Sequence, residues 1–123
     1  MTTPSRPLWD KGASIDAAAQ RFCAGDDVIL DRLLLPHDLR ASRAHVAGLA
    51  RIGLVSEAEA AALIAALDEL ATLVAAGSFV LDDRFEDGHS AIEHFLGERL
   101  GDVGRKVHTG RSRNDQVLVA MRL

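Results

Sequence analysis

The sequence has 123 residues, enough for one small domain, and 48% of them are hydrophobic, so a buried core is possible. Its net charge of −4 excludes binding of nucleic acid through overall positive charge; its single cysteine, Cys23, excludes an internal disulfide framework and fits the reducing cytoplasm. No long uncharged apolar run predicts a transmembrane helix and no secretory signal pattern opens the chain, so neither nucleic acid nor a membrane is an expected partner.

Helix-forming residues set the expected fold class. Alanine, leucine, glutamate and arginine are abundant, β-branched runs are few and aromatic residues make up only 4%, so we expect an all-α protein. Residues 1–13 contain two of the three prolines and show no helical period, which predicts an N-terminal arm.

A short helix is expected to follow the arm. Ser14 is a suitable N-cap for a helix that reaches about Ala24, and Gly25 is suited to end it. Asp26 and Asp27 follow in a turn and have two interpretations. Either they cap the next helix, or Asp26 contacts the amino-acid end of a bound ligand.

Two further helices are predicted to form a hairpin. Proline is favoured in the first turn of a helix and disrupts its interior, so the first helix is predicted from Pro36 to about Ile52. Ser56 and Glu59 form a capping-box pattern that starts the second helix, and Gly77 ends it. This second helix carries no convergent polar groups and is interpreted as structural.

The next helix is predicted to be capped by Asp87 and to end at Gly101. Its side chains His89, Glu93 and His94 raise the alternative of a metal site. His89 and His94 are five residues apart and project to different faces of a helix, so no metal site is predicted.

The connecting segments are predicted to be irregular. Residues 79–85 are expected to be extended. Residues 101–110 contain three glycines without the spacing of a phosphate-binding loop, and they are expected to form a loop that leads to Arg111 and Arg113.

A cluster of polar residues marks the start of the last predicted helix. Ser112 is a good N-cap, and Asp115 stands three residues later, close to a capping box. The first turn of a helix offers unpaired N–H groups and a positive dipole end. Together with Arg111, Arg113 and Asn114, it predicts a receptor for carboxylate or phosphate, the alternative being an ordinary solvated basic patch.

The ten residues from His108 to Val117, HTGRSRNDQV, resemble a motif of argininosuccinate lyase almost residue for residue. That enzyme belongs to the fumarase/aspartase superfamily. The resemblance implies the N-terminal helical domain of that fold and a homotetramer. We expect a cytoplasmic location and no cofactor. It implies the substrate argininosuccinate, which the family splits into arginine and fumarate by β-elimination.

The resemblance also implies a set of substrate-binding residues. Asp87 and His89 match a Glu-Asp-x-His pattern that lies near the active site in the family, whereas a family serine near Gly25 is not matched. The candidates for substrate binding are Arg111, Ser112, Arg113, Asn114, Asp87, His89 and, in place of the serine, Asp26. The family's catalytic acid and base lie in later segments, so no catalytic residue is expected in this one.

Three divisions of the chain follow from these expectations: an arm at 1–13, an N-terminal helical domain at 14–110, and the start of a central helical bundle at 111–123. The last apolar helix has no C-cap glycine, which predicts a fragment. Because the acid and the base are expected elsewhere, the fragment is expected to be inactive alone. Two other functions remain open. One is a helical module that binds an anion or a protein without catalysis, and the other is a lyase of the same superfamily with another fumarate-releasing substrate.

Overall fold

The computed structural model describes residues 16–82 and 84–123, so the predicted arm and Ser14 lie outside the described residues. The described part is helical and contains no strand, which confirms the all-α prediction. The helices are α1 (Ala17–Ala24), α2 (Asp27–Arg51), α3 (Glu57–Ala75), α4 (Gly88–Leu100), α5 (Asp102–Arg105), the 3-10 helix η1 (Lys106–His108) and α6 (Arg113–Ala120).

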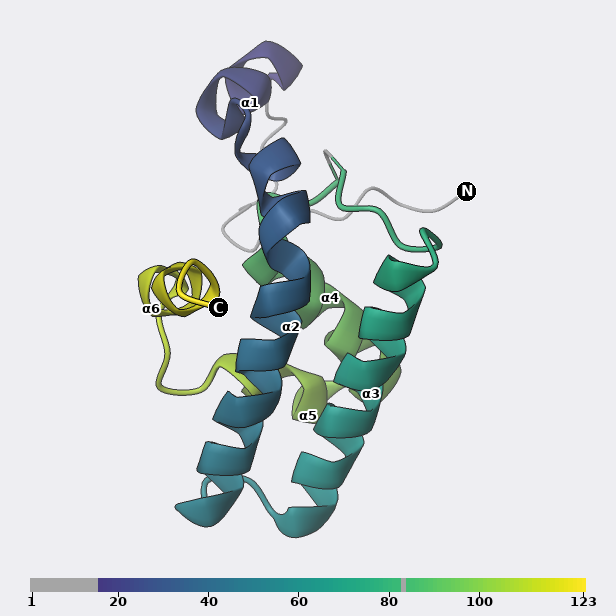
Figure 1. Ribbon diagram of the computed structural model, residues 1–123, viewed down its shortest axis with the longest axis vertical. Helices are drawn as coiled ribbons and strands as arrows, with labels where there is room; N and C mark the ends of the chain where they lie inside the picture. The colour runs from purple at the N-terminus through teal and green to yellow at the C-terminus, as the bar shows by residue number, and fades with distance from the viewer. Residues whose placement is uncertain (1–15, 83) are drawn as a thin grey trace.

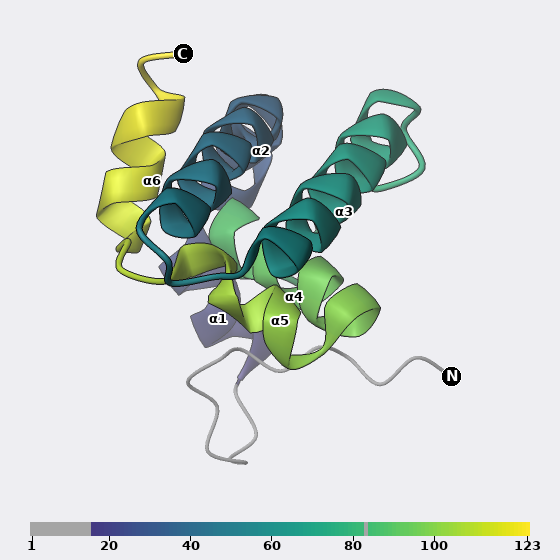
Figure 2. The same ribbon diagram turned by 90° about the horizontal axis from the view of Figure 1, so that it is seen from below.

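The helices pack around an antiparallel pair formed by α2 and α3 (Figure 1). Viewed from below, α6, α2 and α3 form one layer, and α4 and α5 lie across one side of it (Figure 2). The first turns of α2 and all of α1 extend beyond this bundle. The short C-terminal helix α6 packs mainly on α2, on the side away from α3.

The core lies where α2, α3 and α4 meet. The buried apolar residues of each helix follow helical spacing, as Leu63, Leu67 and Leu70 of α3 do, which places them on one face. The main buried side chains are Leu35, Leu39, Val46 and Leu49 of α2, Leu63, Leu67 and Leu70 of α3, Ile92, Phe95 and Leu96 of α4, and Val107 of η1. Burial of this apolar surface is the main stabilising contribution, at roughly 25 cal/mol per Å².

The start and end of α3 agree with the sequence. The Glu59 backbone N–H donates to Ser56 Oγ at 3.1 Å, and the Ser56 N–H donates to Glu59 Oε2 at 3.0 Å, which completes the capping box. Gly77 follows the helix with φ +71°, a conformation that favours glycine. The predicted α4 is also confirmed, because Asp87 caps it and Gly101 follows Leu100.

The prediction that a helix begins at Pro36 is wrong. One helix, α2, runs from Asp27 through Pro36 to Arg51. Two contacts hold the turn before the proline: the Gly88 N–H donates to Asp31 Oδ2 at 2.9 Å, and Arg32 Nε donates to the Leu81 carbonyl at 2.6 Å. These tertiary bonds offset the hydrogen bond that proline cannot donate.

The first helix begins later than predicted. It starts at Ala17, and Asp16 caps it by accepting from the backbone N–H groups of Ala18 and Ala19. The capping interpretation of the next two aspartates is also wrong. Asp26 occupies the N-cap position of α2 without a side-chain capping bond, and Asp27 is already the first residue of the helix.

The predicted loop at 101–110 is largely helical, because α5 and η1 occupy most of it. Buried Gly104 lets α5 approach the backbone of α4 at Leu96 and Gly97. The segment 79–85, predicted as extended, contains bends and a turn at its described positions, with the Phe85 N–H donating to the Asp82 carbonyl.

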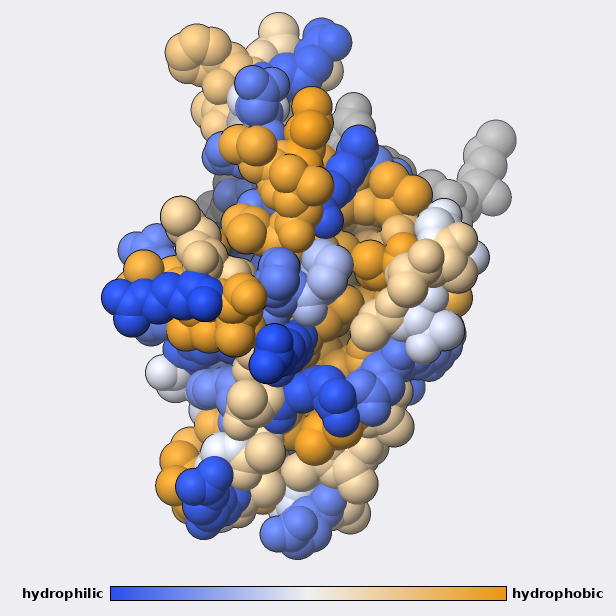
Figure 3. All heavy atoms as spheres, viewed as in Figure 1, coloured by the Kyte–Doolittle hydropathy of each residue, from blue (hydrophilic) through white to orange (hydrophobic). Residues whose placement is uncertain are grey.

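Apart from Ile52, Leu54, Val80 and Leu123, the large exposed apolar side chains of the described residues lie in two groups. One is the extension formed by α1 and the first turns of α2, and the other is α6 (Figure 3). The exposed residues there are Phe22, Ile29, Leu30 and Leu33 on the extension, and Val117, Leu118, Val119 and Met121 at α6. Within the described residues, no helix combines the length and the apolar character needed to cross a bilayer.

Candidate functional site

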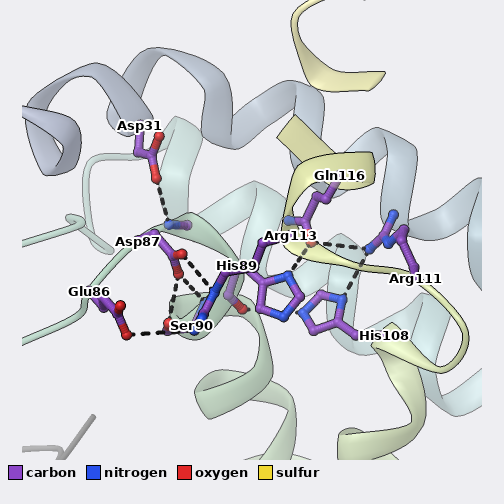
Figure 4. Close-up of polar contacts among 10 residues, drawn as sticks. Asp31, Glu86, Asp87, His89, Ser90, His108, Arg111, Arg113 and Gln116 are labelled. Carbon is purple, nitrogen blue, oxygen red and sulfur yellow. Dashed lines mark hydrogen bonds and ion pairs between the residues drawn. The ribbon is translucent and has the colours of Figure 1, made fainter. Parts of the chain in front are cut away.

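The candidate site lies where the N-termini of α4 and α6 face each other (Figure 4). Asp87 caps α4 by accepting from the Ser90 N–H at 2.7 Å. Ser112 caps α6, where it accepts from the Asp115 N–H at 3.2 Å, and its own N–H donates to Asp115 Oδ2 at 3.0 Å. The predicted capping box of α6 is therefore confirmed.

Arg113 joins the two helix starts. Its Nε lies 2.9 Å from Asp87 Oδ2, and its NH2 donates to Ser90 Oγ at 3.1 Å and lies 3.6 Å from Glu86 Oε2. The guanidinium thus reaches from α6 to the first turn of α4. Asp87 uses one oxygen for the cap and the other for the ion pair, so both groups are held in place.

Arg111 points to the interior instead. Its NH2 donates to Ser42 Oγ at 3.0 Å, to His108 Nδ1 at 3.0 Å and, at 3.4 Å, to Gln116 Oε1. Ser42 and Gln116 are buried, and burial lowers the pKa of Arg111. The structure therefore does not bring Arg111 and Arg113 to one point, contrary to the expectation of a single cationic receptor.

A pair of stacked histidines lies between the two arginines. The rings of His89 and His108 are 3.7 Å apart at their centroids and inclined by 18°. His89 Nδ1 lies 2.6 Å from Gln116 Oε1, and His108 Nε2 lies 3.2 Å from the His89 carbonyl. Burial lowers the pKa of both rings, for His108 to about 3 with the help of His89 and Arg111. Both rings are therefore neutral at pH 7.

The stacked histidines, together with Glu93, form a second candidate for a metal site, with His108 in place of His94. Nitrogens of His89 and His108 and an oxygen of Glu93 lie within 4.8 Å of one another. His108 has no free nitrogen, because Nδ1 receives the Arg111 hydrogen and Nε2 bonds to the His89 carbonyl. Lone pairs of stacked rings also lie in parallel planes and do not converge, so the geometry does not fit a metal. His94 lies elsewhere, 3.5 Å from Glu98.

Asp38 is a buried acid beneath the site. Only 3% of its surface is exposed, and burial raises its pKa to about 6, partly offset by the neighbouring Gln116 amide. Asp38 Oδ1 and Gln116 Nε2 are buried and make no hydrogen bond within the described residues. Gly88 passes close by: a Cβ there would lie 3.1 Å from Asp38 Oδ2. The acid is therefore enclosed by α2, α4 and α6.

The raised pKa of Asp38 makes stability depend on pH in a defined direction. A group that holds its proton more tightly when folded stabilises the fold below its unfolded pKa of 3.8 and loses that contribution as the pH rises through about 6. Between pH 4 and pH 7, the free energy of unfolding of the wild type should fall by up to about 3 kcal/mol relative to that of Asp38→Asn. Urea unfolding of both proteins at several pH values measures this, and parallel curves would contradict it.

Two of the other candidates are placed differently from Arg113. Asn114 is exposed in the first turn of α6, and its side chain makes no hydrogen bond within the described part of the chain. Asp26 begins α2, about 18 Å along the helix axis from Asp38, so it lies apart from the site. The structure thus brings together Asp87, His89 and Arg113, with Asn114 beside them.

Sequence reasoning missed the polar residues under the site, Asp38, Ser42, His108 and Gln116. A signal existed for the first two. They are four residues apart, on the helical face that also carries Leu35, Leu39 and Val46, and polar groups in an apolar stripe need partners.

Comparison with known proteins gives one family and many relatives. A family model described as "Lyase" matches residues 15–123. Proteins named argininosuccinate lyase from Stenotrophomonas maltophilia (strain R551-3) and Xanthomonas oryzae pv. oryzae (strain PXO99A) are 62% and 59% identical over 117 residues. One from Sorangium cellulosum (strain So ce56) is 59% identical over 116 residues. Each match covers 94% of this chain and 27% of the relative, so the chain spans about a quarter of its relatives' length. The resemblance stated from the sequence is confirmed.

Proposed function

This chain belongs to the lyase family, and on that premise we propose that the protein carrying it is an argininosuccinate lyase. The reaction would split argininosuccinate into arginine and fumarate. The observation that carries the proposal is the 62% identity to a relative of that name over 94% of the chain. The placement of Asp87, His89 and Arg113 at two facing helix N-termini supports it.

The chemistry is a β-elimination. A base removes a proton from the carbon next to a carboxylate, the C–N bond breaks, and the departing guanidinium nitrogen takes its electron pair and a proton. The carbon–carbon double bond of fumarate forms between the carbon that lost the proton and the carbon that lost the nitrogen. Negative charge spreads onto the neighbouring carboxylate during the first step, so fixed positive groups beside that carboxylate lower the barrier.

The residues of this chain suit the binding part of that task. Arg113 would exchange its contacts with Glu86 and Asp87 for the ligand carboxylate, and the Asn114 amide lies on the same first turn of α6. The N–H groups and dipole of that turn add further attraction for an anion. Arg111 and Ser112 support this surface from behind, since their side chains are engaged within the protein. We do not place Asp26 in it.

The resemblance also supports a proposed setting for the chain. We propose that residues 14–110 form the N-terminal helical domain and that residues 111–123 begin a central helical bundle. We further propose a homotetramer in the cytoplasm, with the acid and the base supplied by other segments. The exposed apolar side chains of α6, including Leu118 and Val119, are consistent with a helix that packs against more protein.

A chimaera tests the function. This chain replaces the matching segment of the Stenotrophomonas maltophilia relative, and release of fumarate is followed by its ultraviolet absorbance. We expect turnover of argininosuccinate within about tenfold of the intact relative, a difference of about 1.4 kcal/mol in the barrier, and none from the 123 residues alone. A folded chimaera that is inactive on argininosuccinate would overturn the proposal, and activity on another fumarate-releasing compound would favour a different lyase.

A further inference from the structure

We propose that Gln116 is a positioning residue that holds His89 in the tautomer protonated on Nδ1, so that the Nε2 lone pair is available to accept a hydrogen bond from a ligand N–H group. The proposal deepens the proposed function, on which the identity of the ligand rests. The assignment of the tautomer depends only on contacts within this chain.

The first step is the orientation of the Gln116 amide. The side chain is 1% exposed, so its two ends have protein neighbours only. One end faces Arg111 NH2 at 3.4 Å, and a guanidinium can only donate, so that end must be the oxygen Oε1. The other end faces Asp38, whose carboxylate accepts and is stabilised in its charged form by the amide. Both neighbours therefore select the same orientation of the amide.

The second step is the tautomer of His89. Gln116 Oε1 lies 2.6 Å from His89 Nδ1, and a carbonyl oxygen can only accept, so Nδ1 carries the hydrogen. Burial lowers the pKa of the ring, so at pH 7 the ring is neutral and Nε2 is unprotonated. Nε2 makes no hydrogen bond to any part of the chain that the structure describes. It remains available to a ligand.

The third step is that the stacked partner has the opposite tautomer. Arg111 NH2 donates to His108 Nδ1 at 3.0 Å, so that nitrogen bears no hydrogen. The hydrogen is then on His108 Nε2, which donates to the His89 carbonyl at 3.2 Å. Arg111 thus fixes His108 directly and His89 through Gln116. This gives Arg111 a positioning role in place of the ligand contact expected from the sequence.

The consequence for recognition is chemical. A half-buried neutral imidazole with its lone pair outward accepts a hydrogen bond and cannot donate one from that atom. His89 therefore suits an ammonium or guanidinium N–H of the ligand rather than its carboxylate. Arg113 lies on the side of the His89 ring away from His108, and its guanidinium suits the ligand carboxylate. The two ends of an amino-acid-like ligand are thus recognised by different residues.

Nitrogen-15 labelling of histidine tests the tautomers directly. Long-range proton–nitrogen correlation spectra of the 123-residue chain and of the chimaera at pH 7 report which nitrogen of each ring is protonated. We expect the ring hydrogen of His89 on Nδ1 and that of His108 on Nε2. A hydrogen on His89 Nε2 overturns the proposal, whatever the activity of the chimaera. If the tautomers are as expected and the chimaera is inactive, only the proposed function fails.

Two variants of the chimaera test the role of Gln116. Gln116→Met keeps the length of the side chain but removes the oxygen, so His89 should populate both tautomers and kcat should fall about 10-fold to 10²-fold. Gln116→Glu keeps an acceptor, so the tautomer should persist, and the added negative charge should move the acidic limb of the kcat/KM pH profile to higher pH. Arg105→Ala, which removes an exposed side chain that pairs with Asp102 and makes no contact with the rings, is the control. An unchanged tautomer and rate in Gln116→Met would overturn the proposal.

Discussion

Replacing Asn114 by alanine in the chimaera is expected to lower turnover by about 10²-fold or more, the usual effect of removing one hydrogen-bond donor to a developing oxyanion. The amide is exposed and makes no hydrogen bond to the described part of the chain, so the fold does not depend on it. Alanine also has the higher helix propensity, so the free energy of unfolding should be unchanged or slightly larger. Steady-state kinetics and urea unfolding of the same preparation separate the two quantities.

A matched control uses another helix. Glu57 is an exposed residue in the first turn of α3, outside the candidate site, and Glu57→Ala should leave turnover within about twofold, less than 0.5 kcal/mol in the barrier. Near-normal turnover of Asn114→Ala would remove this amide from the site. Equal losses in both variants would show that the chimaera responds to any change at a helix N-terminus.

The second large effect is expected at Gly104. A Cβ built there would overlap the Leu96 carbonyl group and approach the Gly97 nitrogen, all of them backbone atoms that cannot rotate away. Gly104→Ala must therefore push α5 from α4 and disturb buried Val107 just beyond it. We expect a loss of about 3 kcal/mol or more in the free energy of unfolding, at the upper end for overpacking of a core.

The contrasting substitution is Gly97→Ala, in the adjacent turn of α4. A Cβ at Gly97 meets no atom within 4 Å, and the residue lies inside a helix, where alanine is favoured over glycine by roughly 0.5–1 kcal/mol. We expect Gly97→Ala to stabilise the protein, opposite in sign to Gly104→Ala. Urea midpoints that move the same way in both variants would contradict the close packing of α5 on α4.

Local signals predicted some helices well because their ends are determined by neighbouring residues. Ser56 with Glu59, Asp87, and Ser112 with Asp115 all cap the helices that the sequence assigned to them. Prediction of a helix boundary failed where contacts between residues far apart in the sequence determine it. Pro36 sits inside α2 because Asp31 and Arg32 are bound to the segment before α4, far along the chain, and no local pattern reports those bonds.

The candidate site divides in the same way. Of its outer residues, Arg113 was predicted from the polar cluster at the start of the last helix, and Asp87 and His89 from the motif resemblance. The structure places the three together. The inward direction of Arg111 and Gln116 could not be predicted from local sequence, because both look like further surface polar groups of the motif. Only the packing of α6 on α2 buries them against Ser42 and Asp38. Composition predicted the all-α class but not which polar groups would face inward.

The bonds that carry α2 through its proline have a mechanical consequence. Asp31 is tied to Gly88, the first residue of α4, and Arg32 to the Leu81 carbonyl in the preceding connection. These two bonds hold the N-terminal part of α2 against the start of α4. Asp87, which binds Arg113, directly precedes Gly88, so the anchor of α2 and the ion pair of the candidate site meet at the first turn of α4.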